Sequence, residues 1–284
     1  MAGLIAIGDN TIDVYLDQNI EYPGGNALNV AVLAARLGAR SAYLGCVGDD
    51  RHGQYLLDCL HQETVEVSRC RMLPDASGWA CVDSAEGERV FLGSDPGVCR
   101  RLRLDAEDLA YIARFPLAHS SLYSGLESQV AKIRDACGCL SFDFSDNWVE
   151  FDWQAVIKQV DIAFFSAADL SPVQAYELAN SMRSMGPEVV VITRGAQGAI
   201  AVDAQGTHEQ PALPCTFVDS MGAGDGFIAA FLLAWQAQQN LANCLFRGVD
   251  YAGQVCGWAG GFGHGQPVDS ERVRQLKHAL NIQG

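Results

Sequence analysis

The chain has 284 residues, of which 49% are hydrophobic and 19% are charged, a composition typical of a globular protein with a large core. The formal net charge of −15 disfavours nucleic acid and anionic membrane surfaces as partners, because both are themselves negatively charged. The first residues contain no basic segment followed by a long apolar run, so we expect no export signal and a cytoplasmic location.

Strands and helices alternate along most of the chain. Apolar runs predict strands at residues 4–8, 41–47, 140–144, 162–165 and 189–193. Apolar residues at helical spacing predict one helix over residues 26–38 and a strongly apolar one over residues 224–236. This alternation predicts an α/β fold in which helices cover both faces of a mostly parallel sheet.

Two segments interrupt the alternation. Residues 78–93 predict a hairpin whose two short strands flank an Ala-Glu-Gly-Glu turn, and residues 11–22 read as extended or irregular. The two segments could pair as a small β-sheet beside the main one. Such a sheet is either a lid over a pocket or a surface feature, and composition does not choose between them.

The cysteines and histidines give no sign of metal chemistry. The ten cysteines form no C-x-x-C pair, and the six histidines form no H-x-x-H or H-E-x-x-H pattern. Cys137 and Cys139 are close in sequence, but no second pair completes a tetrahedral site. A metal hydrolase is therefore disfavoured.

Polar side chains follow the predicted strands where each strand ends. In open parallel sheets, ligands bind beyond the carboxyl ends of the strands, so these residues predict a site. The alternative is that strand ends are polar because loops are exposed. The residues in question are Asp9, Asp143, Ser145, Ser166, Asp169, Thr193, Arg194 and Gly195.

The most informative motif is the stretch DSMGAGD, residues 219–225, which leads into the apolar helix. Small residues let backbone N–H groups approach a phosphate, and a helix start directs its positive dipole end at that phosphate. Asp225 would repel the phosphate but could accept a proton from an attacking hydroxyl. The alternative is an ordinary Asp N-cap after a glycine turn.

A second motif is GGNALN, residues 24–29, after Pro23. Its glycines suit a tight turn, and Asn26 and Asn29 share one helix face, from which their amides could bind sugar hydroxyls. The alternative is a capped glycine turn without a ligand. Neither G-x-G-x-x-G nor a glycine-lysine phosphate loop is present, which disfavours dinucleotide-binding dehydrogenases and P-loop enzymes.

A third motif is GDNTID, residues 8–13, at the end of the first strand. Carboxylates such as Asp9 and Asp13 accept hydrogen bonds from vicinal hydroxyls and can pair with an amine. Taken singly, each could also be an exposed turn residue.

Together, these motifs resemble the PfkB (ribokinase-like) carbohydrate kinase family. The stretch beginning GGNALNVAVLAARLG resembles its first signature, DSMGAGDGFIAAFL its second, and ITRGAQGA its nucleotide-binding strand and loop. The resemblance implies a three-layer α/β/α sandwich with a mostly parallel central sheet and a small β-sheet lid. It further implies a single kinase domain over residues 1–284, with the lid formed by segments of about 11–22 and 76–95.

The resemblance implies ATP-dependent phosphorylation of a sugar, with Mg²⁺ accompanying ATP. It makes Asp225 the catalytic base and Asp219 a neighbour of a monovalent cation such as K⁺. The implied anion hole is Gly222, Ala223 and Gly224. The implied sugar contacts are Asp9, Asp13, Gly24, Gly25, Asn26 and Asn29, and the implied nucleotide contacts are Ser166, Asp169, Thr193, Arg194, Gly195 and Gly198.

One departure from the family pattern concerns the magnesium waters. Many relatives carry Asn-x-x-Glu where this chain has Ser166-Ala167-Ala168-Asp169. Asp169 would replace the glutamate with a shorter reach, and Ser166 would replace the asparagine with a smaller polar group.

Within the family, IGDNTIDVY, FDFSDNW and FFSAAD are most similar to the motifs of fructoselysine kinases. This likeness implies transfer to the 6-hydroxyl of a fructosamine, whose cationic amine could pair with Asp13 or Asp95. The alternatives are another kinase of the family, such as a fructokinase, ribokinase or nucleoside kinase, and a non-catalytic nucleotide or sugar sensor on the same fold.

The resemblance also implies a homodimer, because relatives often pair through the lid sheet. An exposed hairpin edge carrying Trp79, Val82 and Val90 would suit such an interface.

Overall fold

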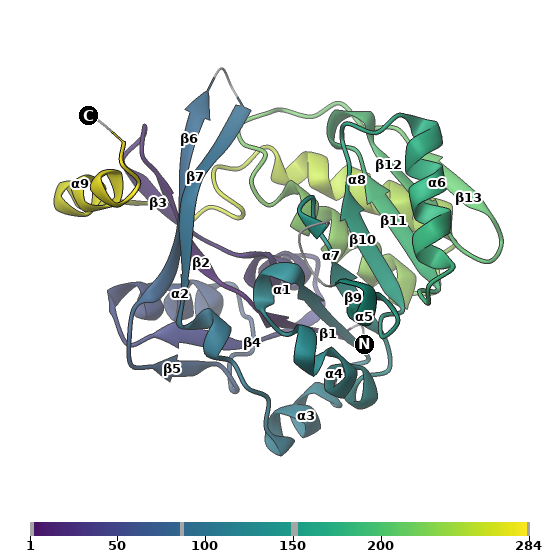
Figure 1. Cartoon of the computed structure of the whole chain (residues 1–284), viewed down its shortest axis with the longest axis horizontal. Helices are drawn as coiled ribbons and strands as arrows, with labels where there is room; N and C mark the ends of the chain where they lie inside the picture. Colours follow the sequence, from purple (N-terminus) through teal and green to yellow (C-terminus); the bar gives the residue numbers. More distant parts are fainter. Residues whose placement is uncertain (1–2, 86–87, 149–152, 283–284) are drawn as a thin grey trace.

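The computed structural model describes residues 3–85, 88–148 and 153–282. In this part of the chain, helices cover both faces of a large twisted sheet, and a smaller sheet stands beside it (Figure 1). The elements therefore form a three-layer α/β/α sandwich with an attached β-sheet.

The large sheet is parallel from β11 to β5 and antiparallel at its other edge, where β12 and β13 pair. In spatial order, its strands are β13 (Thr207–Gln210), β12 (Ala199–Val202), β11 (Val189–Thr193), β10 (Ile162–Ser166), β9 (Leu140–Asp143), β8 (Leu117–Ser121), β1 (Gly3–Gly8), β4 (Arg40–Gly48) and β5 (Arg71–Leu73).

The helices divide between the two faces of this sheet, each face burying its own apolar cluster. One face carries α1 (Asn26–Arg36), α2 (Arg51–Gln62), α7 (Ala223–Gln236) and α8 (Leu241–Val255). The other face carries α3 (Ala106–Ile112), α4 (Val130–Ala136), α5 (Trp153–Ile157) and α6 (Pro172–Arg183). Strand residues are buried on both faces, as the continuous apolar runs predict.

Glycines bring α7 and α8 into close contact. A Cβ atom at Gly226 of α7 would lie 2.6 Å from the Val255 side chain, and one at Gly248 of α8 would lie 2.7 Å from the ring of Phe227. Larger residues would separate the helices, so these positions favour glycine. The tight contact fixes the start of α7, where the candidate base lies.

The smaller sheet has the spatial order β14 (Gln266–Pro267), β3 (Ile20–Gly24), β2 (Thr11–Tyr15), β6 (Ser77–Ala85) and β7 (Glu88–Gly97). The C-terminal helix α9 (Ser270–Ala279) lies beside it, and its Arg272 is 3.6 Å from the buried carboxylate of Glu21 in β3 (Figure 1). Segments from the two ends of the chain thus build one sheet.

Most sequence predictions for the elements are confirmed. The predicted strands of the large sheet and both helices lie within about two residues of the observed bounds, whereas the second hairpin strand runs on to Gly97. Residues 11–22 pair with the hairpin through β2 and β6. Residues 86–87 of the predicted turn lie outside the described residues. No helix in the described ranges is long and apolar enough to cross a membrane.

The prediction of an exposed Val82 is wrong. Its side chain is fully buried against Tyr15 and Tyr22. Val90 of the outer strand β7 is exposed as predicted, at 42%, and the neighbouring Phe91 is exposed at 63%. Val82 lies in β6, between β2 and β7, and its side chain points to the face that Tyr15 and Tyr22 cover, whereas β7 is the outer strand. Sequence alone did not show which strand of the hairpin was outermost.

Candidate active site

The loop before α7 ends in a glycine with a left-handed backbone. Gly222 has φ = 74°, and a Cβ atom there would lie 2.7 Å from the backbone of Gly261. By contrast, a Cβ at Gly224, two residues later, would have no heavy atom within 4 Å. Gly222 is therefore required by the fold, whereas Gly224 leaves open space at the helix start.

The first turn of α7 supplies backbone donors. The Ala223 N–H already donates to the Ser220 carbonyl at 3.2 Å, and the Gly226 N–H closes the first helical turn on Gly222. At this point of a helix, the N–H groups of Gly224 and Asp225 have no intrahelical acceptor. The N–H groups of Gly224 and Asp225 are thus available to an anion, whereas that of Ala223 already has an acceptor. The anion hole of Gly222, Ala223 and Gly224 stays a prediction.

The carboxylate of Asp225 is held by two amides from α1. Asn26 Nδ2 donates to one carboxylate oxygen at 2.8 Å, and Asn29 Nδ2 donates to the other at 2.7 Å. The structure thus brings the glycine turn of residues 24–29 to the start of α7. Both predicted motifs contribute to one polar cluster.

Asp9 anchors the glycine turn from the end of β1. One of its oxygens accepts the backbone N–H of Asn26 at 2.6 Å, and the other accepts the hydroxyls of Ser121 and Ser124 at 3.0 and 2.9 Å. Asp9 is buried, with 7% of its surface exposed. Its carboxylate therefore holds the start of α1 in place, in addition to any contact with a ligand.

The structure adds two residues to the predicted cluster. Asp143, at the end of β9, accepts a 2.9 Å hydrogen bond from the same Asn26 nitrogen that binds Asp225. His119 of β8 lies 3.0 Å from the Asn26 side-chain oxygen. The strand-end position of Asp143 was visible in the sequence, but nothing there linked it to Asn26. A lone histidine inside a strand gave no signal.

Burial changes the protonation of both carboxyl groups. It raises the pKa of Asp143 to about 7, and the neighbouring Asp9 carboxylate adds to the effect. It also raises the pKa of Asp225, whereas the hydrogen bonds from Asn29 and Asn26 act in the opposite direction. Asp225 as a whole residue is only partly buried. A carboxylate with a raised pKa at the start of a helix suits proton abstraction.

Asp13 lies on the other side of the turn, in β2 of the smaller sheet. A Cβ atom at Gly24 would be 2.1 Å from an oxygen of the Asp13 carboxylate, so glycine makes room for that buried group. At Gly25, φ is 103° and a Cβ atom would be 2.6 Å from the Cα of Asn10. The two glycines therefore let the turn pass between the two sheets.

The predicted nucleotide residues lie at the ends of β10 and β11. The hydroxyls of Ser166 and Thr193 are 3.2 Å apart, and Asp169 is exposed in the turn after β10. Gly195 and Gly198 have φ angles of 55° and 93°, which fit the tight turn between β11 and β12. Because β9, β10 and β11 are parallel, these residues lie at the same carboxyl edge of the sheet as the end of β9.

The Arg194 side chain is turned inward. It is 2% exposed and donates to the Leu170 carbonyl at 3.2 Å and to the Gln197 side chain. Its guanidinium therefore stabilises the loop, and a nucleotide contact from Arg194 stays a prediction. Sequence could not distinguish these roles, since both need an arginine after the strand.

Asp219 joins three segments instead of facing open space. One carboxylate oxygen accepts the Met221 N–H at 2.6 Å, and the other accepts the Gly260 N–H and the Tyr15 hydroxyl, each at 2.8 Å. The Asp219 carboxylate therefore ties the loop before α7 to β2 and to the segment around Gly260. Its place beside a monovalent cation stays a prediction.

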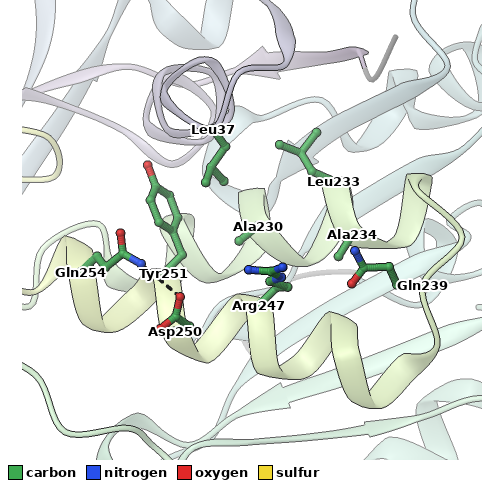
Figure 2. Close-up of a pocket in the computed structure, with 9 residues that line it drawn as sticks. All are labelled: Leu37, Ala230, Leu233, Ala234, Gln239, Arg247, Asp250, Tyr251 and Gln254. Carbon is green, nitrogen blue, oxygen red and sulfur yellow. Dashed lines mark hydrogen bonds between the residues drawn. The ribbon is translucent and has the colours of Figure 1, made fainter.

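A separate hollow of about 300 Å³ lies where α7 and α8 meet the end of α1 (Figure 2). Leu37 and Leu233 line it together with the more polar Arg247, Asp250 and Gln254. No residue of the polar cluster around Asp225 lines this hollow. The candidate active site is thus distinct from it.

Known proteins with similar sequences span almost the whole chain. Fructosamine kinase FrlD of Bacillus subtilis (strain 168) is 42% identical over 285 residues, covering 96% of this chain and 99% of that protein. Fructoselysine 6-kinase of Escherichia coli (strain K12) is 33% identical over 263 residues, covering 92% of this chain and 99% of that protein.

The fold and the family model agree with these relatives. The structure of Arabidopsis thaliana ribokinase complexed with ribose and ATP superposes with a TM-score of 0.80 at 18% identity, covering 100% of both chains, and shows the ribokinase-like fold. Residues 4–262 match the model for pfkB family carbohydrate kinases. The chain therefore belongs to the pfkB family of carbohydrate kinases.

Proposed function

We propose that this kinase transfers the γ-phosphate of ATP to the 6-hydroxyl of a fructosamine such as fructoselysine. The hydrogen bonds that join Asp225 to the amides of Asn26 and Asn29 carry this assignment, because they put a base at a helix start that can receive phosphate. The relatives named fructosamine kinase and fructoselysine 6-kinase support the choice of acceptor.

In the proposed reaction, Asp225 accepts the proton of the sugar hydroxyl as its oxygen attacks the γ-phosphorus in line. The N–H groups of Gly224 and Asp225 stabilise the charge that develops on the transferred group. Asn26 and Asn29 each donate to one oxygen of the carboxylate, which fixes its orientation for the acceptor.

Mg²⁺ supplies charge neutralisation at the phosphates when it is bound with ATP. Asp169 fits this group because it offers an exposed carboxylate in the turn after β10, and the Ser166 hydroxyl lies at the end of the same strand. Asp169 and Ser166 would hold the ion through its waters.

The substrate amine has a candidate partner in the smaller sheet. Asp13 lies against Gly24, beside the turn that carries Asn26, whereas Asp95 is exposed on the outer strand β7 and accepts the Gly97 N–H at 2.8 Å. Asp13 is therefore the better placed of the two for a cationic group close to the sugar.

The smaller sheet is assigned as a lid of a single kinase domain. It borders the Asn26 turn through β2 and β3, so that its approach would shield the phosphoryl group from water. Its outer strand carries the exposed Val90 and Phe91, which suits contact with a second copy in a homodimer.

An acceptor panel tests the assignment. The purified protein is given ATP, Mg²⁺ and, separately, fructoselysine, a second fructosamine, fructose, ribose and a nucleoside, and the product is identified by NMR. We expect the highest kcat/KM with a fructosamine and phosphorylation at its 6-hydroxyl. Preference for an unsubstituted sugar or a nucleoside would overturn the assignment of a fructosamine as acceptor. If ATP is hydrolysed but none of the compounds in the panel is phosphorylated, phosphoryl transfer to sugars would be overturned.

A further inference from the structure

His119 is a buried histidine that the reaction above does not use. It lies in β8, between β1 and β9, and none of its surface is exposed. Both ring nitrogens have partners: Nδ1 lies 2.8 Å from the Ser141 hydroxyl, and Nε2 lies 3.0 Å from the Asn26 side-chain oxygen. The ring thus connects the core of the sheet to the residue that holds Asp225.

The partners fix the proton positions along this path. Asn26 Nδ2 faces the carboxylates of Asp143 and Asp225 at 2.9 and 2.8 Å, so the Asn26 oxygen must face His119. An amide oxygen only accepts, and therefore Nε2 of His119 carries the proton. Nδ1 is then the acceptor for the Ser141 hydroxyl.

We propose that His119 is a positioning residue, whose Nε2–H locks the Asn26 amide with its amino group toward Asp143 and Asp225. The hydrogen bonds of the ring go to Asn26 and Ser141, so His119 acts on the Asp225 carboxylate only through Asn26. Without this donor, the Asn26 oxygen would be buried without a partner, and the amide could reverse or withdraw from the carboxylates.

The acidic groups around Asp225 make the orientation of the Asn26 amide important. Asp143 of β9, Asp9 after β1 and Asp146 in the loop after β9 are the acidic groups around Asp225 and Asp143, and Asp13 of β2 and Asp219 lie on adjoining segments. In the described residues, no arginine or lysine forms an ion pair with Asp9, Asp143 or Asp225. The asparagine N–H groups are therefore important stabilisers of the Asp225 anion.

Two effects on pKa agree with this role. Burial lowers the pKa of His119 to about 3, so the ring is neutral and keeps one donor and one acceptor at working pH. Burial raises the pKa of Asp225, and the hydrogen bond from Asn26 opposes that rise. Loss of the hydrogen bond between His119 and Asn26 should therefore raise the Asp225 pKa. The acidic limb of the kcat/KM profile should then move to higher pH.

The test compares His119→Leu with His119→Gln, in which a side-chain amide can still donate to Asn26. Because this role rests on the proposed function, the parent protein is first shown to phosphorylate its acceptor, and kcat/KM is then measured from pH 5 to 9. We expect the acidic limb of His119→Leu to move up by about one pH unit, with activity recovering at high pH. His119→Gln should stay near the parent profile.

His52→Leu is the matched control, because His52 is also buried but pairs with Glu21 instead of this path. Its acidic limb should not move. An unmoved limb in His119→Leu, or an equal shift in His52→Leu, would overturn the proposal. If His119→Leu does not fold, the Ser141→Ala variant tests the proposal, because it removes the partner of Nδ1. Its acidic limb should move in the same direction by a smaller amount, and an unmoved limb would overturn the positioning role of His119.

If the parent protein shows no phosphoryl transfer, the proposed function is refuted instead.

Discussion

The side-chain amide of Asn26 donates a 2.8 Å hydrogen bond to the carboxylate of Asp225, a residue 199 positions further along the chain. The same nitrogen lies 2.9 Å from the carboxylate of Asp143. One amide thus joins an early turn, a middle strand and a late helix. The chemistry of the site depends on this meeting point, and the following outcomes are expected from it.

Asp225→Asn should retain the fold and ATP binding while turnover falls by about 10²- to 10⁴-fold, because the amide cannot accept the hydroxyl proton. Thermal unfolding with and without ATP checks binding, and a coupled ADP assay checks turnover. Turnover equal to that of the parent would show that Asp225 is not the base.

Gly222→Ala and Gly224→Ala form a matched pair. The first places a Cβ atom 2.7 Å from the Gly261 backbone at φ = 74° and should lower the free energy of unfolding by about 1–3 kcal/mol. The second meets no atom within 4 Å and should fold normally, yet its methyl group would displace the phosphoryl group and reduce turnover by about 10²-fold. Urea unfolding measures the loss of stability and kcat the loss of turnover. A stable Gly222→Ala together with an unfolded or fully active Gly224→Ala would contradict the prediction.

Asp143→Asn should stabilise the protein more at pH 8 than at pH 5. The folded-state pKa of Asp143, about 7, is above its unfolded value, so its contribution to stability is fully present below the unfolded pKa and is lost as pH rises through 7. We expect the free energy of unfolding of the variant relative to the parent to rise by about 2–3 kcal/mol between pH 5 and pH 8. Urea titrations at both pH values measure it; a relative stability that falls with pH would exclude a raised pKa.

Turnover should rise with K⁺, because the family resemblance places Asp219 beside a monovalent cation. A carboxylate that accepts hydrogen bonds from the Gly260 N–H and the Tyr15 hydroxyl, each at 2.8 Å, can still face a cation. Assays in which choline replaces K⁺ at constant ionic strength should give a lower kcat. Equal kcat in the two salts would show that Asp219 serves only to join its three segments.

Phe91→Glu should convert the proposed homodimer to monomers without lowering kcat greatly, since the exposed Phe91 lies on the outer strand β7 of the lid sheet. Mass measurement in solution, by light scattering, tests this. Val173→Glu is a control at another exposed apolar residue, located in α6. A parent that is monomeric at all concentrations would rule out the dimer.

The sequence by itself determined the local elements and the two motifs that frame the site. Apolar runs such as 189–193 have one stable arrangement, a buried parallel strand, and glycine-rich turns before apolar helices define helix starts at Asn26 and Ala223. Periodicity and turn chemistry are local properties, so they can be read from neighbouring residues. The α/β class followed from the alternation of these elements.

Only the tertiary structure decided which distant groups meet and how each is used. It linked His119 and Asp143 to Asn26, turned the Arg194 guanidinium inward, buried Val82 and tied Asp219 to Tyr15. Each outcome depends on the packing of segments far apart in the chain, and burial then sets hydrogen bonding and pKa. A residue type shows what chemistry is available, whereas its surroundings decide whether that chemistry serves the fold or the substrate.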